Sequence, residues 1–301
     1  MNALIRKPTI IGVVILLIIV PIIYWYHVTH TQIMLRISTT TSLYATGLLD
    51  ELADKFMEKH PNVIVQFIAV GSGEALRRAS MGDADMVFVH APSLEKQYIE
   101  EGILVDGAII AYNTFVIVGP VKDPAKIKGL DVINAFKEIF KAGEENRALF
   151  VSRGDNSGTH VRELAIWNLA GLDPHGRSWY LESGTGMSKT LLIANEKNAY
   201  TLSDIGTYLK LKKEGKLPNL EILVDKGDVL LNIYSVYIVN PEKVKGVKYE
   251  LAKRFRDFVL SEGQEIIGRY GVEKYGRPLF YPAKDKEEML KEAWNRLVKL
   301  G

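Results

Sequence analysis

Short apolar runs alternate along the chain with longer segments whose apolar residues recur every three or four positions. Apolar runs at 35–39 and 62–70 predict strands, the second of them buried, and the spacing within 43–59 predicts a helix between them. A further strand is expected at 84–91 and a helix at 93–102. Strands that alternate with helices at this spacing predict βαβ units and a largely parallel sheet, so the fold class is α/β.

The same alternation continues to the end of the chain, interrupted by two long β-rich stretches at 108–118 and 229–240. Between and after these stretches the pattern predicts strands at 147–152 and 179–182 and helices at 131–142, 157–170, 187–197, 206–214, 248–269 and 284–300. Two long stretches that bracket an α/β insert indicate two lobes joined by two crossovers.

The first thirty residues carry a separate signal. Residues 10–23 are almost wholly apolar and are followed by three aromatic residues at 24–26, as at a membrane interface. A helix over 9–26 would be about 27 Å long, which matches a bilayer core. Because Arg6 and Lys7 precede the segment, the positive-inside rule places the N-terminus in the cytoplasm and the remaining chain outside.

A cleavable signal peptide is the alternative interpretation of residues 1–30. Its apolar core is normally shorter and ends at a small-x-small cleavage site, which is absent here. The chain also has no cysteine, so no lipidated thiol can tether it. We therefore expect an uncleaved N-terminal transmembrane helix that anchors the protein on the extracytoplasmic face of the cell membrane.

Composition narrows the function classes. With 47% apolar and 25% charged residues, the 301-residue chain has the profile of a globular protein. The net charge of +2 gives no electrostatic reason to expect nucleic acid. The absence of cysteine excludes disulfides, thiolate metal sites and a cysteine nucleophile.

Hydroxyl-rich and glycine-rich loops stand where predicted strands end and helices begin. Residues 38–42 read Ser-Thr-Thr-Thr-Ser, more hydroxyls than one helix cap needs, and residues 71–74 read Gly-Ser-Gly-Glu. Residues 152–160 add hydroxyls, glycines and one fixed cation, Arg153. Residues 183–188 form a fourth such loop, and 201–204 are a candidate fifth.

Ligands of open α/β sheets bind beyond the carboxyl ends of strands, where helix N-termini offer free N–H groups. A turn or a cap is the structural alternative for each loop taken singly. Together, however, the loops supply many neutral N–H and O–H donors and a single guanidinium, which suits a desolvated oxyanion. No cofactor and no site for a metal cation are expected.

These loops resemble those of the tungstate-binding component of Tup-type ABC importers. The resemblance covers about residues 35–282 and is carried by residues 39–42, 71–73, 152–160, 184–187 and 200–204. It implies a two-lobed type II periplasmic-binding-protein fold, with lobe 1 formed by 33–112 plus 236–301 and lobe 2 by 113–235. It also implies an ABC permease with its ATPase subunit as partner, and we expect the binding protein to be a monomer.

Carried over position by position, the resemblance assigns the oxyanion contacts to Thr40, Thr41, Ser42, Ser72, Arg153, Ser157, Gly158 and Thr159. Gly71, Thr185 and Ser203 are further candidates.

The identity of the oxyanion stays open at this point. Tungstate, molybdate and sulfate are fully deprotonated at neutral pH and need donors only, whereas phosphate often keeps a proton and needs an acceptor. Asp155 or Asp204 could supply that acceptor, or could cap a helix or pair with an arginine. The preference for tungstate over molybdate, which is nearly the same size, rests on the resemblance.

A secreted hydrolase and a membrane-bound sensor are the alternatives to a binding protein. A secreted hydrolase would need a nucleophile motif, but the chain has no G-x-S-x-G, no H-E-x-x-H and no Walker A sequence. A membrane-bound sensor would need an output domain, and only about eight residues precede the apolar segment. We therefore expect a protein that is not an enzyme and that captures tungstate, with phosphate and molybdate as the alternative ligands.

Overall fold

The computed structural model describes residues 32–299 together with residues 17, 19 and 20. Most of the predicted membrane segment, 9–26, therefore lies outside the described residues. Within the described part of the chain, none of the helices combines the length and the apolar character that a bilayer crossing requires.

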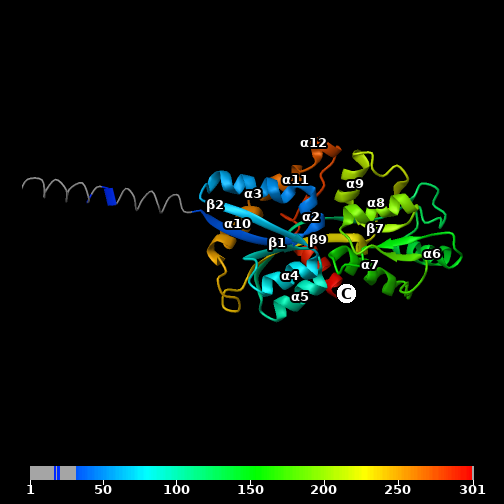
Figure 1. Cartoon of the computed structure of the whole chain (residues 1–301), viewed down its shortest axis with the longest axis horizontal. Helices are drawn as coiled ribbons and strands as arrows, with labels where there is room; N and C mark the ends of the chain where they lie inside the picture. The colour runs from blue at the N-terminus through cyan, green and yellow to red at the C-terminus, as the bar shows by residue number, and fades with distance from the viewer. Residues whose placement is uncertain (1–16, 18, 21–31, 300–301) are drawn as a thin grey trace, which may run out of the picture.

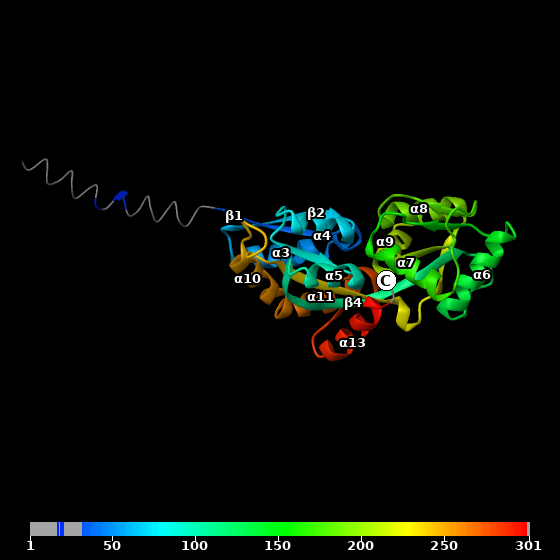
Figure 2. The same cartoon turned by 90° about the horizontal axis from the view of Figure 1, so that it is seen from below.

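The described elements form two bodies that lie side by side along the long axis of the molecule (Figures 1 and 2). Two strands, β4 (Leu104–Pro120) and β9 (Leu231–Val239), extend through both bodies and pair antiparallel over most of their length. They correspond to the two β-rich stretches of the sequence. One sheet thus continues from the first body into the second.

In the first body the sheet order is β10-β4-β9-β3-β1-β2. The outer strands are β1 (Ile33–Thr40), β2 (Val63–Val70) and β3 (Met86–Val89), and β10 (Tyr281–Pro282) borders β4. The helices of this body are α2 (Thr41–Thr46), α3 (Leu48–Lys59), α4 (Ser72–Ser80), α5 (Pro92–Glu100), α10 (Tyr249–Leu260), α11 (Gly263–Arg269), α12 (Val272–Tyr275) and α13 (Glu287–Val298).

Alternate residues of β3 belong to two different cores. Met86 and Phe88 pack with apolar residues of α3, α10 and α11, whereas Val87 and Val89 pack with those of α4. Since successive side chains of a strand point to opposite faces, helices cover both faces of this sheet.

The second body is built on the far half of β4. There β7 (Thr201–Asp204) and β8 (Leu220–Val224) pair antiparallel with β4, and β5 (Phe150–Ser152) pairs parallel with β6 (Tyr180–Glu182). Its helices are α6 (Val132–Glu144), α7 (Gly158–Leu169), α8 (Met187–Lys197) and α9 (Ile205–Lys213), with a short 3-10 turn, η1 (Asp228–Leu230), before β9.

Helices again cover both faces. Phe115 and Ile117 of β4 pack with α6 and α7, and Val116 and Val118 pack with α8 and α9. Together the two bodies give an α/β fold in which a curled mixed sheet joins two helix-covered halves, as expected for the fold class.

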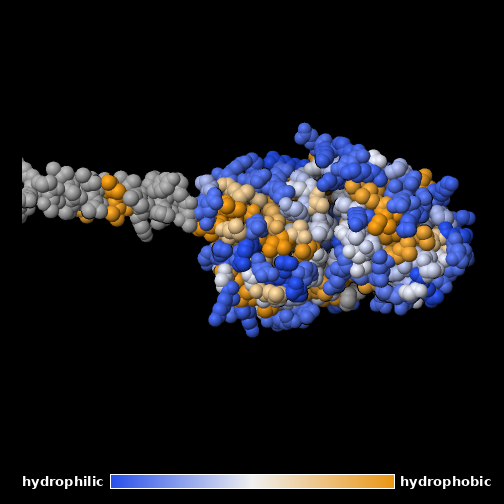
Figure 3. Space-filling view, in the orientation of Figure 1, coloured by the Kyte–Doolittle hydropathy of each residue, from blue (hydrophilic) through white to orange (hydrophobic). Residues whose placement is uncertain are grey.

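Several expectations about the strands are wrong. The sheet is not largely parallel, because β4 and β9 run antiparallel to every strand they pair with: the chain enters the second body on one and returns on the other. β2 lies at an edge and is only half-buried, and apolar residues gather on the surface around β1 and β2 in Figure 3. Residues 201–204 form a strand rather than a loop, and β8 is not predicted by the pattern.

Two predicted helices are each broken into two. The segment 43–59 becomes α2 and α3, which Gly47 separates with a φ of 88°. A side chain at Gly47 would meet the Tyr270 hydroxyl, which hydrogen-bonds to the Thr46 carbonyl oxygen. The segment 248–269 becomes α10 and α11, since Ser261 leaves the helical conformation with a φ of −107° and a ψ of −95°.

Two helical glycines allow a test of this packing. A Cβ at Gly143 of α6 would lie 2.4 Å from the Trp179 ring, whereas at Gly268 of α11 the nearest atom would be at 3.5 Å. We expect Gly143→Ala to lower the free energy of unfolding by about 1–3 kcal/mol through overpacking. Gly268→Ala should raise it by up to about 1 kcal/mol, because alanine favours a helix. Urea unfolding of both variants checks this, and equal effects would contradict the packing around Trp179.

Candidate functional site

The hydroxyl-rich loops of the two bodies meet where the strands end. In the first body the carboxyl ends of the parallel strands β1, β2 and β3 lead into residues 40–42, 71–72 and 90. In the second body the ends of β5 and β6 lead into residues 153–159 and 183–186. We call the boundary at which these loops face each other the seam. It is pale in Figure 3, the colour of residues that are neither strongly polar nor apolar.

Glycines allow the loops to approach closely. A Cβ at Gly73 would lie 2.6 Å from Nδ2 of Asn156, and one at Gly71 would lie 3.4 Å from the Asp155 carbonyl oxygen. A Cβ at Gly158 would lie 2.7 Å from the His90 carbonyl oxygen. The N-terminus of α4 therefore faces the N-terminus of α7 across the seam, and both helices present free N–H groups there.

Arg153 is the cation of this seam and is 2% exposed. Its Nη2 donates to the Asp155 carboxylate and, at 3.4 Å, to Oγ1 of Thr41 in the other body. The second Asp155 oxygen accepts the N–H of Ser157 at 3.2 Å. The ion pair with Asp155 fixes the Arg153 guanidinium in the loop. Nε of Arg153 remains buried without a partner among the described residues.

Six further buried side-chain atoms among residues 32–299 also lack a partner, and three of them belong to hydroxyl residues of the predicted ligand loops or the strand before them. The hydroxyls of Thr39, Ser72 and Thr159 are buried and have no hydrogen-bond partner within the described part of the chain. Each unsatisfied buried polar group costs about 1–3 kcal/mol, so such groups are rare in folded proteins. Together with Nε of Arg153 these are hydrogen-bond donors, and the species that would satisfy them is an acceptor such as an oxyanion.

A buried network fixes the direction of the neighbouring hydrogen bonds. Asn232 of β9 donates through Nδ2 to Asn113 and Tyr234, so its Oδ1 accepts the Nδ1–H of His90 at 2.8 Å. The other ring nitrogen of His90 then accepts the hydroxyl of Ser42 at 3.4 Å. In this arrangement the Ser42 hydroxyl donates to the protein.

The same network holds His90 in its neutral form. The pKa of the His90 ring is lowered to about 4, mainly by burial; the hydrogen bond to Asn232 opposes this effect, and the Arg153 and Arg162 guanidinium groups add to it. The ring is stacked on Tyr234, with centroids 5.1 Å apart. Ser42, His90 and Asn232 are connected like a nucleophile, a base and an orienting residue. The small cavity beside His90, about 10 Å³, is lined by Gly158 and Arg162 among others and not by Ser42 or Asn232.

A buried acid, Glu163 of α7, is hydrogen-bonded to Ser152, the residue before Arg153. It accepts the Ser152 hydroxyl at 2.7 Å, the Tyr180 hydroxyl at 2.7 Å and the Trp167 indole N–H at 3.1 Å. Burial raises the pKa of the Glu163 carboxyl to about 7, because the three donors offset only part of the desolvation. Glu163 thereby links the strand before Arg153 to the helix after it.

Most residues predicted for the site lie at the seam. Thr40 and Ser157 cap α2 and α7 and accept the N–H groups of Leu43 and His160, each at 3.3 Å. The structure brings into this region Gly71, Ser72, Arg153, Ser157, Gly158 and Thr159 together with Thr40, Thr41 and Ser42.

Two candidates have their hydroxyls engaged within the second body. Thr185 contacts Ser183 and Thr190 through Oγ1, and Ser203 donates to the Asp204 carbonyl oxygen at 2.9 Å. The loop of Thr185 still touches the other body, since a Cβ at Gly186 would lie 3.5 Å from Oγ1 of Thr41.

His90, Asn113, Asn232 and Glu163 are not among the site residues predicted from the sequence. His90 did carry a usable signal, because it follows a buried strand just as the predicted loops do. The two asparagines sit within apolar stretches of β4 and β9 and become register partners only when those strands pair. No local pattern reveals that pairing.

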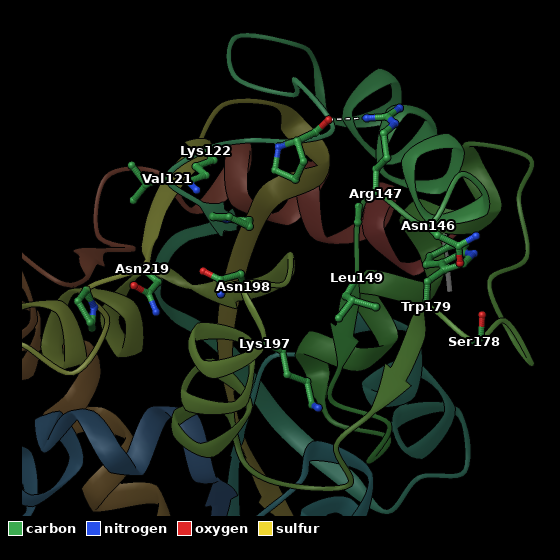
Figure 4. Close-up of a pocket in the computed structure, with 14 residues that line it drawn as sticks. Val121, Lys122, Asn146, Arg147, Leu149, Ser178, Trp179, Lys197, Asn198 and Asn219 are labelled. Carbon is green, nitrogen blue, oxygen red and sulfur yellow. Dashed lines mark hydrogen bonds between the residues drawn. The ribbon is translucent and has the colours of Figure 1, made fainter.

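Two large cavities lie away from the seam. One, of about 790 Å³, is at the outer part of the second body and is lined by Lys122, Arg147 and Lys197 among others (Figure 4). Arg147 is exposed and paired with Glu145, and Lys197 ends α8, whose carbonyl groups disfavour an anion. The other, of about 730 Å³, lies between β4, α11 and α13.

Comparison with known proteins gives a consistent result. A family model described as a PBP superfamily domain matches residues 27–263. The tungstate-binding protein TupA of Peptoclostridium acidaminophilum is 41% identical over 250 residues, which cover 82% of this chain and 84% of that protein.

Solved structures agree. The tungstate-binding protein TupA from Desulfovibrio alaskensis G20 is 40% identical with a TM-score of 0.69, and the match covers 83% of this chain and 98% of that one. The structure described as the tungstate ABC transporter from Geobacter sulfurreducens is 45% identical with a TM-score of 0.69, over 79% of this chain and 98% of that one.

Two buried serines allow a test of whether a hydroxyl serves the ligand or the fold. Ser72 and Ser38 are both 0% exposed, but only Ser38 has a partner, the Ala75 carbonyl oxygen at 2.9 Å. We expect Ser72→Ala to stabilise the anion-free protein by about 1 kcal/mol and to weaken anion binding about tenfold or more. Ser38→Ala should instead destabilise the protein by about 1 kcal/mol and leave binding unchanged. Unfolding and titration of both variants check this, and destabilisation of Ser72→Ala with intact affinity would rule Ser72 out of the site.

Glu163 predicts a dependence of stability on pH. Because its pKa of about 7 in the folded chain exceeds the ordinary value of 4.5, its stabilising contribution is complete below pH 4.5 and is lost as the pH rises through 7. This loss amounts to about 3 kcal/mol.

Glu163→Gln should remove this part of the pH dependence between pH 5 and 8, whereas Glu196→Gln on the exposed face of α8 should retain it. Urea unfolding at several pH values measures the effect. An unaltered slope in Glu163→Gln would show that Glu163 does not titrate in this range.

Proposed function

This chain belongs to the PBP superfamily and, within it, to the family of tungstate-binding TupA proteins. We propose that it captures tungstate outside the cytoplasm and delivers it to an ABC permease. The observation that carries the proposal is the set of buried donors without acceptors at the seam, from Ser72, Arg153 and Thr159. Such a site suits capture of a ligand, and the tungstate-binding relatives support a binding protein rather than an enzyme.

The acids near the seam favour a fully deprotonated ligand. Both oxygens of Asp155 already accept hydrogen bonds, from Arg153 and from Ser157. Both oxygens of Asp204 accept hydrogen bonds from Thr207, at 2.8 Å each. A protonated phosphate needs an acceptor for its O–H. Because protein donors already engage both carboxylates, this arrangement gives phosphate less support than tungstate or molybdate. The choice of tungstate over molybdate rests on the relatives.

Capture would proceed by closure of the two bodies. The lobes that we propose to move are 33–112 plus 236–301 and 113–235, whose boundaries fall inside β4 and β9. The N-termini of α4 and α7 approach the dianion from opposite sides, and their dipoles favour negative charge. Binding shifts the population toward the closed form, and the permease with its ATPase recognises that form.

We further propose that the protein acts as a monomer on the extracytoplasmic face of the cell membrane and that the apolar segment 9–26 anchors it there. The support is the length of that segment and the cations before it. Fractionation of cells tests the anchor: recovery of the mature chain in the soluble fraction, shortened by about thirty residues, would show cleavage instead.

Calorimetric titration with tungstate, molybdate, sulfate and phosphate tests the function. We expect tight binding of tungstate, and Arg153→Gln should weaken it about 10- to 150-fold because one charge-assisted hydrogen bond is lost. Arg177→Gln, an exposed arginine of the same body, is the matched control. Tight binding of phosphate alone would retain the oxyanion site and reject tungstate, and binding of none of the four anions would reject the site.

A further inference from the structure

A second arginine, Arg162, is buried beside the seam and has no carboxylate partner. It is 5% exposed and lies on α7, one turn after Gly158. Its Nη1 donates to the carbonyl oxygens of Val229 and Leu231, and its guanidinium lies 5.7 Å from the centre of the Phe115 ring. Among residues 32–299, no Asp or Glu forms an ion pair with it.

The geometry of α7 directs this side chain toward the ligand loops. Helical side chains lean toward the N-terminus, so Arg162 extends along the face of Gly158, which has no side chain. Arg162, Gly158 and His90 line one small cavity of about 10 Å³. Gly158 is the first residue of α7, and His90 contacts Ser42 of the first body. The guanidinium is therefore close to the N-terminal turn that faces α4.

An unpaired buried cation is unfavourable unless something compensates it. Burial lowers the pKa of Arg162 to about 10, which still leaves the group charged at neutral pH. Two carbonyl oxygens and one aromatic ring compensate part of the desolvation. No anionic group of the described chain completes the compensation.

The other groups around the seam do not provide a free positive charge. Arg153 is paired with Asp155, and His90 is neutral. Asp204 is buried against Thr207, and burial raises its pKa. Of the three buried basic residues within 32–299, namely His90, Arg153 and Arg162, it is thus Arg162 whose positive charge no described carboxylate balances.

We propose that Arg162 is the counter-charge that makes the site select a doubly charged tetrahedral oxyanion over a singly charged one of the same size. The inference rests on the proposed function and identifies a specificity-determining residue for it. Arg162 acts through the electric field and needs no direct contact with the ligand. In a water-poor seam this field is weakly screened.

The proposal makes a quantitative prediction. Coulomb energy is proportional to the charge of the ligand, so removal of one distant cation costs a dianion twice the free energy that it costs a monoanion. The fold-loss of affinity for the dianion should therefore be about the square of the fold-loss for the monoanion. A residue that acts by contact or packing would reduce both affinities by similar factors.

The experiment titrates the full-length protein with tungstate and with perrhenate, a tetrahedral monoanion of nearly the same size. Arg162→Met keeps an unbranched apolar side chain beside Phe115, and Arg162→Gln keeps an uncharged N–H donor on a shorter side chain. Arg177→Met is the control: it removes the same charge from the same body and lies equally 5.7 Å from an aromatic ring, that of Phe140, but is exposed.

For both Arg162 variants we expect tungstate affinity to fall about 10- to 100-fold and perrhenate affinity to fall only about 3- to 10-fold, while Arg177→Met changes neither. Should the methionine variant fail to fold, the glutamine variant provides the same comparison. Equal factors for the two anions, or unchanged tungstate affinity in a folded variant, would overturn the proposal. The proposed function itself would fail differently, through absence of tungstate binding by the unaltered protein.

Discussion

The arrangement of the seam follows from one constraint, the cost of removing a doubly charged ion from water. Water offers such an ion many O–H donors, so a dry site must supply an equal number, already oriented. Here the donors are hydroxyls, helix N–H groups and one guanidinium held by Asp155. Several of these donors are buried without a partner among the described residues, and the fold must supply stability elsewhere to tolerate them.

The sheet explains how those donors are held. Because β1 to β3 run parallel, their carboxyl ends lie at one edge, and β5 and β6 present theirs from the opposite body. The continuous strands β4 and β9 carry both bodies and place Asn113 and Asn232 opposite each other. His90 connects this pair to Ser42, so the ligand loops and the crossover strands share one hydrogen-bond network. Through this network, a movement of the crossover strands would also move the loops proposed to bind the ligand.

Sequence patterns predicted the features that are local. Hydroxyl-rich loops at strand ends predicted a common site for residues 40–42, 71–72 and 153–159, which do lie near one another, and apolar periodicity predicted the bounds of α8 to the residue. What depends on partners distant in sequence was missed: Gly47 breaks a helix against Tyr270, and β4 and β9 make the sheet mixed. In the sequence, Arg162 and Glu163 look like an ordinary polar pair on the surface of a helix. The structure shows instead that both side chains are buried.

The central claim is that one tetrahedral dianion binds at the seam between the N-termini of α4 and α7. Diffraction from crystals grown with tungstate, recorded at the tungsten absorption edge, locates the metal directly. The account predicts one anomalous peak within hydrogen-bonding reach, through the oxygen atoms, of Ser72 Oγ, Thr159 Oγ1 and Arg153 Nε. A peak instead among Lys122, Arg147 and Lys197 in the cavity of Figure 4, with the seam empty, would contradict it.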